Sequence, residues 1–150
     1  MECLYSLTME WKNMKKYLAA FTLTLFALLT YNSVYAANSV DWHNYSPSVF
    51  QQAKSANRTV MLFAMSNTCH WCEQMKTSTF TDAAVVKMMN DNFYAVKLQA
   101  DKDSVAATKF GLESVPTIIF FDGSGNMKKT YKGFVKADVM MQYLTEMKSG

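Results

Sequence analysis

The sequence has few of the residues that break regular structure and few of the residues that bind metals. Among its 150 residues there are five glycines, two prolines, three cysteines and two histidines, while half of all residues are hydrophobic. This composition excludes a disordered, collagen-like or low-complexity chain. We therefore expect one packed globular domain, because a chain of this length holds little more than one.

The chain also lacks a block of one charge sign. Fifteen lysines and arginines against twelve aspartates and glutamates give a net charge of +3, and the charges are spread along the chain. Nucleic-acid binding relies on clustered positive charge. We therefore expect no nucleic-acid partner.

The N-terminal residues are typical of an export signal. Lys15 and Lys16 precede an uncharged apolar run over 17–31, and Val34 and Ala36 then occupy the positions at which signal peptidase selects small residues. The apolar run is shorter than the roughly 20 residues of a membrane span. A retained N-terminal segment that tethers the protein to the membrane is the alternative.

These features divide the chain into two parts. We expect an N-terminal extension and signal peptide over 1–36, with translation starting at Met1 or at Met14, and a folded domain over 37–150. Cleavage near Ala36 would make the domain periplasmic or otherwise exported.

The expected domain contains two cysteines, Cys69 and Cys72, which stand three positions apart in SNTCHWCEQM. An exported protein meets an oxidising compartment, where thiols pair. A disulfide between these two would close a very short loop and would restrict the unfolded chain little. The pair is therefore expected to serve chemistry rather than stability.

Hydrophobic periodicity and turn residues predict alternating helices and strands. Residues 58–66 form a continuous apolar run, as in a strand buried on both faces, and DGSGN at 122–126 predicts a turn that joins two antiparallel strands. The order predicts an α/β sandwich with a sheet of about four strands, in which a βαβ half precedes a β-hairpin and a last helix. The expected helices are 46–57, 69–80, 81–92, 103–111 and 136–150, and the expected strands are 58–66, 93–101, 117–121 and 127–133.

Capping residues place the helix ends. Ser46 is expected as the first N-cap with Pro47 at the first helical position, and Thr81 or Asp82 is expected to cap the third helix. The apolar residues of the last helix are spaced to face the sheet, and these are Val139, Met140, Tyr143, Leu144 and Met147.

The cysteine pair falls where the strand over 58–66 gives way to a helix. A thiolate at Cys69 would face unpaired backbone N–H groups and the positive end of the helix dipole. Cys72 follows one helical turn later, on the same face. This arrangement favours a redox couple in which Cys69 is the nucleophile and Cys72 resolves the mixed disulfide.

The two residues between the cysteines admit two interpretations each. An imidazole at His70 can stabilise the Cys69 thiolate and make the disulfide more oxidising, or it can simply point into solvent. Trp71 is expected to offer an apolar platform to a substrate, and the alternative is a ring packed at the start of the helix.

Other chemistries of a cysteine pair fit less well. Haem attachment needs a histidine directly after the second cysteine, where Glu73 stands. A zinc site needs four ligands, and His43, expected to be a surface or packing residue, is distant in sequence. Copper binding by the two thiolates stays open.

Three segments, MLFAMSNTCHWCEQM, SVPTIIFFDGSG and KGFVKADVMMQYL, resemble the thioredoxin-like superfamily over residues 41–148. The spacing of the CxxC motif, the Val-Pro-Thr segment and the glycine at Gly133 is specific to it. Within the superfamily the chain is most similar to small exported thioredoxin-related thiol–disulfide interchange proteins.

The resemblance implies a three-layer α/β/α sandwich and a cis-proline at Pro116. A cis bond there would turn the chain sharply and expose the backbone of Val115 beside the disulfide. A substrate strand could then pair with that backbone, so Val115 and Thr117 are the expected substrate-binding residues.

The chain also departs from the superfamily pattern. Phe63 occupies the position of a buried carboxylate in thioredoxin, and Thr68 replaces the usual tryptophan before the first cysteine. Only 44 positions separate Cys72 from Pro116, which leaves no room for the helical insertion of dedicated periplasmic oxidases.

Together these observations predict an exported thiol–disulfide oxidoreductase that acts on protein substrates, mainly as a reductase. A membrane thiol protein would re-reduce the Cys69–Cys72 pair, and the cycle would need no metal or organic cofactor. We expect a monomer. The alternatives are a disulfide oxidase or isomerase, and a binding protein that carries copper or acts as a chaperone.

Overall fold

The structure is a computed structural model, and it describes residues 39–148. The expected signal peptide over 1–36 lies outside these residues. In chain order the elements are β1 (Trp42–Asn44), α2 (Val49–Ser55), β2 (Thr59–Met65), α3 (His70–Gln74), the π-helical turn η2 (Met75–Thr79), α4 (Ala83–Asn92), β3 (Phe93–Gln99), α5 (Ser104–Lys109), β4 (Thr117–Phe121), β5 (Met127–Lys132) and α6 (Ala137–Lys148).

The strands form one mixed sheet in the order β1-β3-β2-β4-β5. The three strands β1, β3 and β2 run parallel, whereas β4 is antiparallel to β2 and β5 is antiparallel to β4. The predicted hairpin after residue 116 is therefore confirmed. β2 is the central strand of the sheet. Both cysteines follow its carboxyl end, so they lie at the end of the sheet where the parallel strands finish.

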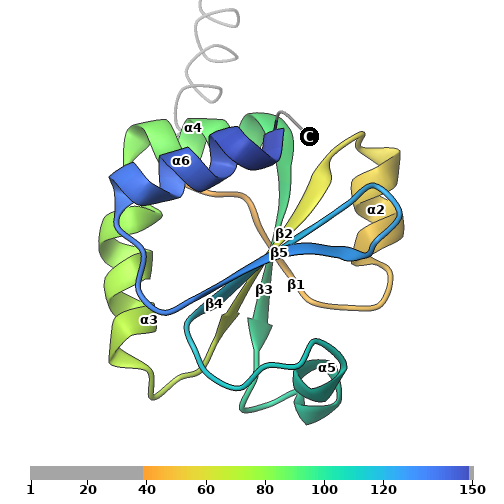
Figure 1. The fold of residues 1–150 in the computed structure, drawn as a ribbon, viewed down its shortest axis with the longest axis vertical. Coiled ribbons are helices and arrows are strands. Elements are labelled where there is room, and N and C mark those ends of the chain that lie inside the picture. Colours follow the sequence, from red (N-terminus) through yellow and green to blue (C-terminus); the bar gives the residue numbers. More distant parts are fainter. Residues whose placement is uncertain (1–38, 149–150) are drawn as a thin grey trace, which may run out of the picture. The chain divides into compact units, whose positions relative to one another are not determined.

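Helices cover both faces of the sheet and make three layers (Figure 1). On one face α3, α4 and α6 enclose a core that contains Phe63, Met75, Val86 and Leu144. On the other face α2 and α5 enclose a second core that includes Leu62. The alternation of Leu62 and Phe63 between the two cores explains why β2 is apolar throughout, since a strand covered on both faces has no solvent side.

The sheet has five strands rather than about four, because β1 was not expected. This three-residue strand pairs with the outer edge of β3. Its Trp42 ring packs against Phe63 and Phe80, with ring centroids 5.9 and 5.0 Å apart. Val40 and Trp42 point inward while Asp41 is exposed. The sequence therefore contained one sign of this strand, a short alternation of apolar and polar residues with a period of two.

The first long helix begins later than predicted. Its N-cap is Ser48, which makes no side-chain capping bond, and Pro47 precedes the helix. The Ser46 hydroxyl lies 2.9 Å from the Ser48 hydroxyl, and the Ser46 carbonyl accepts a turn bond from Val49 N at 3.1 Å. The predicted cap at Ser46 was therefore wrong, because this serine belongs to a preceding turn.

The other helix ends follow the sequence more closely. Asp82, and not Thr81, caps α4, because its carboxylate accepts from the backbone N–H groups of Ala84 and Val85. In α6 the residues Met140, Leu144 and Met147 are buried. The predicted apolar face of the last helix is confirmed, since Val139 and Tyr143 also pack against the core.

The helix predicted over 69–80 is divided between α3 and η2. In this stretch Thr77 and Ser78 donate their hydroxyls to backbone carbonyls of Glu73 and Gln74, four residues earlier, at 3.0 and 2.6 Å. Such bonds compete with the regular helical pattern. A π-helical turn next to a CxxC motif is of interest, because these turns occur frequently at functional sites.

Candidate redox site

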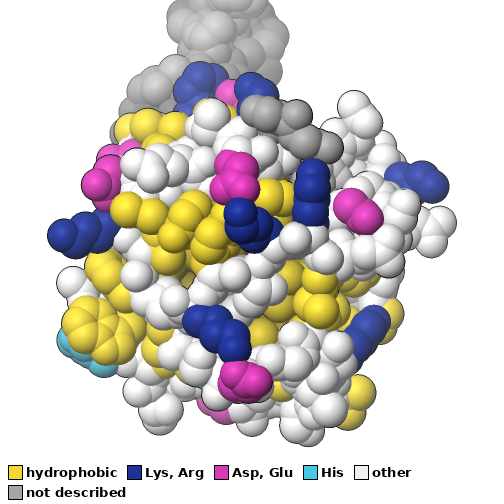
Figure 2. All heavy atoms as spheres, in the orientation of Figure 1, with side chains coloured by type: hydrophobic (Ala, Val, Ile, Leu, Met, Phe, Trp, Pro, Cys, Tyr) yellow, Lys and Arg dark blue, Asp and Glu magenta, His cyan; other side chains and the backbone are white. Residues whose placement is uncertain are grey.

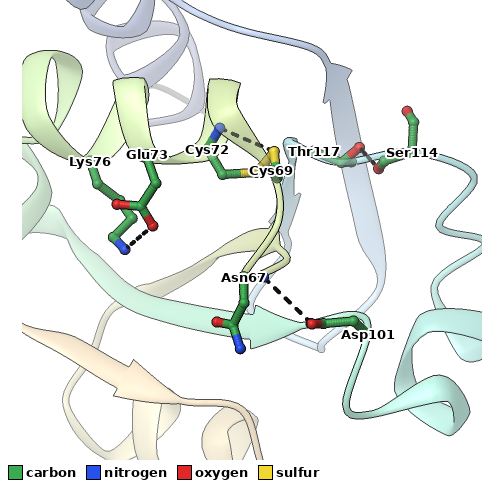
Figure 3. Close-up of a disulfide and its surroundings, with 8 residues drawn as sticks. All are labelled: Asn67, Cys69, Cys72, Glu73, Lys76, Asp101, Ser114 and Thr117. Carbon is green, nitrogen blue, oxygen red and sulfur yellow. Dashed lines mark hydrogen bonds and ion pairs between the residues drawn. A yellow bond between two sulfur atoms is a disulfide. The ribbon is translucent and has the colours of Figure 1, made fainter.

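Cys69 and Cys72 form a disulfide at the start of α3 (Figure 3). Cys69 is the N-cap residue of this helix, with extended backbone angles, and its sulfur accepts a hydrogen bond from Cys72 N at 3.1 Å. The Cα atoms lie 5.2 Å apart. The helix start predicted at this point is confirmed, and the Cys72 N–H in its first turn is shared between the Cys69 sulfur and the Cys69 carbonyl, each at 3.1 Å.

The two cysteines differ in burial. Cys72 is completely buried against the core beneath α3, whereas Cys69 is only partly buried. A reacting partner approaching from outside can therefore reach Cys69 and not Cys72.

The residues between the cysteines are both exposed. Trp71 has 54% of its surface exposed, and its ring makes an edge contact with His70 at 5.5 Å and a tilted contact with Phe134 at 5.6 Å. The exposed aromatic surface suits the predicted platform. The contact recorded for the His70 ring is with Trp71, so its effect on the Cys69 thiolate stays a prediction.

The peptide bond between Val115 and Pro116 is cis, as the resemblance implied. Val115 is partly buried and packs against the core that also contains Cys72. The Thr117 side chain is buried, and its hydroxyl donates to the Ser114 carbonyl at 2.7 Å. A substrate-binding role of Thr117 stays a prediction, and with this burial it would have to act through the backbone.

The buried carboxylate of thioredoxin has no counterpart near this disulfide among residues 39–148. Phe63 is 1% exposed and belongs to the core. Glu73 points away from the disulfide and pairs with Lys76 at 2.7 Å (Figure 3). Glu73 is therefore a surface residue of α3 and is not a replacement for the missing carboxylate.

A small polar network precedes the cysteine pair and was not anticipated from the sequence. Gln99 donates from Nε2 to Asn67 Oδ1 at 3.1 Å, and the backbone N–H of Asn67 donates to Asp101 Oδ2 at 3.5 Å. The network joins the loop before Cys69 to the end of β3 (Figure 3). The sequence did contain a sign of this network. Polar residues follow two neighbouring parallel strands, and the carboxyl ends of such strands lie side by side at the same end of a sheet.

Three consecutive residues after β5 contact three parts of the redox site. Gly133 N donates to the Pro116 carbonyl at 2.8 Å, with Gly133 at a φ of +93° that favours glycine. Phe134 contacts Trp71. The Val135 carbonyl accepts a hydrogen bond from Thr79 Oγ1 at 2.6 Å.

Thr79 was missed from the sequence, although it carried a signal. It lies four residues after Met75 and seven after Cys72 on the buried face of the helical stretch, and it is 1% exposed. A hydroxyl at such a position must find a partner within the fold.

His43 is a packing residue, as expected. Its ring stacks on Tyr94 with centroids 4.0 Å apart and 8° between the ring planes. Among residues 39–148, no group of three or more His, Cys, Asp or Glu side chains is placed to hold a metal ion.

Solved structures with the same fold include a thioredoxin from Thermus thermophilus. It superposes with a TM-score of 0.64 at 22% identity, over 72% of this chain and 86% of that one. The fold is therefore that of thioredoxin, and the Cys69–Cys72 disulfide forms a CxxC pair within it.

The family follows from the sequence match. The model of the family described as Thioredox_DsbH, protein of unknown function, DUF255, matches residues 27–109, more than half of the chain, and the chain belongs to this family. The match includes the cysteine pair and ends before the cis-proline.

Curated relatives are similar over shorter stretches. An uncharacterized protein of Caenorhabditis elegans, B0495.5, is 37% identical over 68 residues, which cover 45% of this chain and 9% of that protein. The thiol:disulfide interchange protein DsbD of Ralstonia nicotianae is 34% identical over 99 residues, 61% of this chain and 16% of DsbD. This chain therefore spans only a small part of the length of the curated relatives that it matches.

Proposed function

We propose that this protein is an exported thiol–disulfide oxidoreductase that acts on protein substrates mainly in the reducing direction. The observation that carries the proposal is the asymmetry of the disulfide. Cys69 is reachable at the N-terminus of α3, whereas Cys72 is completely buried behind it. This arrangement fits an attacking cysteine and a resolving cysteine.

The proposed cycle starts from the reduced pair. The Cys69 thiolate attacks one sulfur of a substrate disulfide, and the other substrate sulfur leaves as a thiolate. The Cys72 thiolate then attacks the Cys69 sulfur and releases the second substrate thiolate. The substrate gains two electrons, and the protein is left with the Cys69–Cys72 disulfide that the structure contains.

A donor must return two electrons to complete the cycle. We propose a membrane thiol protein as that donor, because the expected export signal places the domain outside the reach of cytosolic reductants. The cycle needs no metal or organic cofactor, and one domain suffices, so a monomer is the proposed state. Among residues 39–148, no helix is long and apolar enough to cross a membrane.

Two observations support the reducing direction. The segment between Cys72 and Pro116 contains η2, α4, β3 and α5 in sequence, with no added helical domain of the kind expected in a dedicated oxidase. The His70 ring contacts Trp71, and the hydrogen bond that the Cys69 sulfur accepts comes from the backbone N–H of Cys72. A hydrogen bond from the His70 imidazole would instead favour an oxidase or isomerase, since stabilising the thiolate raises the reduction potential.

The reduction potential of the cysteine pair tests the proposal. The full chain in a non-ionic detergent would be equilibrated with glutathione buffers, and the dithiol fraction measured by thiol alkylation and mass spectrometry. A value of about −250 mV or lower, in the thioredoxin range, supports a reductase. A value of about −150 mV or higher would instead indicate an oxidase or isomerase.

A further inference from the structure

A groove lies between the edge strand β5 and the helix α6. It has a volume of about 490 Å³. Figure 2 shows hydrophobic side chains gathered on the side of the molecule that carries β5 and α6 in Figure 1, with lysine or arginine side chains beside them. The residues that matter here are Tyr131, Lys132, Phe134, Lys136, Val139 and Tyr143.

The groove is continuous with the redox site. Phe134 lines the groove and contacts Trp71, which stands between the two cysteines. The exposed face of Trp71 and the groove therefore form one surface that starts beside Cys69. A polypeptide whose cysteine had bonded to Cys69 would have its neighbouring residues next to this surface.

The groove is also held in shape before any partner arrives. Gly133 and Val135, on either side of Phe134, are hydrogen-bonded to Pro116 and to Thr79. The Tyr131 ring of β5 also stacks on the Tyr143 ring of α6, with centroids 3.6 Å apart, which joins the two elements that border the groove. A preformed surface binds with less loss of conformational freedom than one that must be ordered.

The charged side chains that line the groove are positive, and two carboxylates lie beside them: Glu113, which pairs with Lys132, and Glu146, which accepts a hydrogen bond from the Tyr131 hydroxyl at 3.1 Å. Both charged residues in its lining are lysines. Lys132 is paired with Glu113 at 2.5 Å, and its hydrogen bond holds the pKa of Glu113 below the ordinary range. Lys136 is exposed, and within residues 39–148 no ion pair is recorded for its ammonium group. One cation at the groove is therefore available to a partner.

The lysines of β5 argue against a second copy of this chain as the occupant. β5 is an edge strand that carries Lys128, Lys129 and Lys132, of which Lys129 pairs with Glu146 at 2.6 Å and Lys132 with Glu113, whereas Lys128 makes no ion pair within residues 39–148. Lysines on an edge strand oppose pairing with an identical edge, because like charges would face each other. A segment that carries carboxylates would instead be attracted to these lysines.

We propose that the β5–α6 groove binds an extended acidic segment of the protein substrate, adjacent to the substrate's reactive cysteine. In this arrangement an aromatic or aliphatic side chain of the substrate packs on Trp71 and Phe134, and a carboxylate pairs with Lys136. The proposal rests on the proposed function and specifies its substrate class: proteins with acidic and apolar residues beside the cysteine that reacts.

Single-turnover reactions with matched peptides test this proposal. Each peptide carries one cysteine as a mixed disulfide with thionitrobenzoate, so that attack by Cys69 on the peptide sulfur releases the coloured thiolate. One peptide has Phe and Asp residues beside the cysteine, a second has Phe and Lys, and a third has Gly and Asp. The full chain in non-ionic detergent is reduced beforehand and freed of reductant.

The expected result is that the Phe-Asp peptide reacts faster than both others, by about fivefold over the Phe-Lys peptide at low salt. The preference should shrink as salt screens the exposed charges. Lys136→Glu should reverse the preference between Asp and Lys peptides. Lys54→Glu, a reversal of an exposed charge on α2 outside the groove, is the matched control and should keep it.

Two controls separate this proposal from the proposed function. Reaction of the wild-type chain with hydroxyethyl disulfide, which is uncharged and small, reports the cysteine pair alone. If this reaction proceeds and the three peptides react alike, or if Lys54→Glu acts as strongly as Lys136→Glu, the groove proposal is wrong and the proposed function stands. If no disulfide reacts, the proposed function fails. Self-association that Lys136→Glu alters, measured by sedimentation, would make a second copy the occupant and overturn the proposal.

Discussion

At the scale of single residues, the difference in burial between Cys69 and Cys72 determines what each sulfur can do. The buried Cys72 can reach only the sulfur next to it, so its chemistry is intramolecular. The partly exposed Cys69 is the point at which an external disulfide can enter. Removing one cysteine at a time therefore separates the two steps of the proposed cycle.

We expect Cys72→Ser to accumulate mixed disulfides with substrate proteins through Cys69. Without the second thiol, the covalent complex has no fast intramolecular route to release. The complexes would be seen as reductant-sensitive bands of higher mass on non-reducing gels and identified by mass spectrometry. Most of the variant should be trapped, whereas the wild type should show little.

The matched control is Cys69→Ser, which should form far fewer complexes because the remaining thiol is buried. Equal trapping by the two variants would contradict the assigned roles. Stoichiometric copper binding by the wild type that either variant abolishes would favour the copper-carrier alternative.

Sequence predicted the chemistry-bearing residues of the site better than their neighbours. Cys69 and Cys72 were predicted from their spacing at the start of a helix, and the cis-proline at Pro116 from the resemblance to the thioredoxin-like superfamily. The contacts of Thr79 and Phe134 join residues more than fifty positions apart. No local pattern specifies such partners, because they depend on how α3, η2 and the loop after β5 pack together.

At the scale of secondary-structure elements, the π-helical turn η2 joins the cysteine-bearing helix to the loop after β5. Its contact is the buried Thr79 hydroxyl on the Val135 carbonyl. Neither atom has access to water, so each depends on the other. The turn thereby fixes the loop that presents Phe134 to Trp71.

We expect Thr79→Val to destabilise the fold by about 1 to 3 kcal/mol, because it leaves the Val135 carbonyl buried without a donor while hardly changing the side-chain volume. Thr79→Ser retains the hydroxyl and should recover part of this loss. Urea denaturation followed by circular dichroism measures both. A Thr79→Val variant as stable as the wild type would show that the hydrogen bond contributes nothing.

The turn between β4 and β5 has a pH dependence that follows from Asp122. Its carboxylate accepts from the backbone N–H groups of Asn126 and Ser124, at 2.9 and 2.8 Å, and from the Asn126 side chain at 3.1 Å. The bonds from Asn126 are the main reason that the pKa of Asp122 lies below its ordinary value of 3.8. A carboxyl group with a lowered pKa stabilises the fold above the pKa of the unfolded chain, and this contribution is lost as the pH falls through the folded value.

Asp122→Asn should therefore lower the melting temperature at about pH 6 and make little difference at about pH 2. The asparagine keeps one acceptor oxygen but removes the charge. Differential scanning calorimetry at several pH values would show the two curves converging on acidification. A gap that stays constant across this range would mean that the charge of Asp122 does not contribute.

Elements were predicted where local signals were strong and missed where tertiary contacts decide. β2, β3 and β4 coincide with apolar runs, and β5 comes directly after a glycine-containing turn. β1 has only three residues, and its position depends on the packing of Trp42 against Phe63 and Phe80. The division of 69–80 into α3 and η2 similarly depends on hydroxyl contacts that periodicity does not reveal.

At the scale of the whole molecule, the sandwich couples its own stability to the redox state of the pair. The fold must accommodate both the disulfide and the two thiols, and the difference in folding stability between these states shifts the potential of the folded pair relative to the unfolded chain. For a two-electron couple, about 1.4 kcal/mol of this difference corresponds to about 30 mV. A reductase should therefore be more stable when oxidised, and an oxidase should be more stable when reduced.

We expect the oxidised protein to be the more stable form, by about 2 kcal/mol, because so short a disulfide loop lies at the low end of the stabilisation that disulfides give. Urea denaturation with and without excess reductant measures the difference. The variant with both Cys69→Ser and Cys72→Ser should have the same free energy of unfolding under the two conditions. If the reduced form proved more stable, the folded protein would favour the thiol state. The direction of the reaction would then have to be assigned to oxidation or isomerisation, even though the fold and the cysteine roles stayed the same.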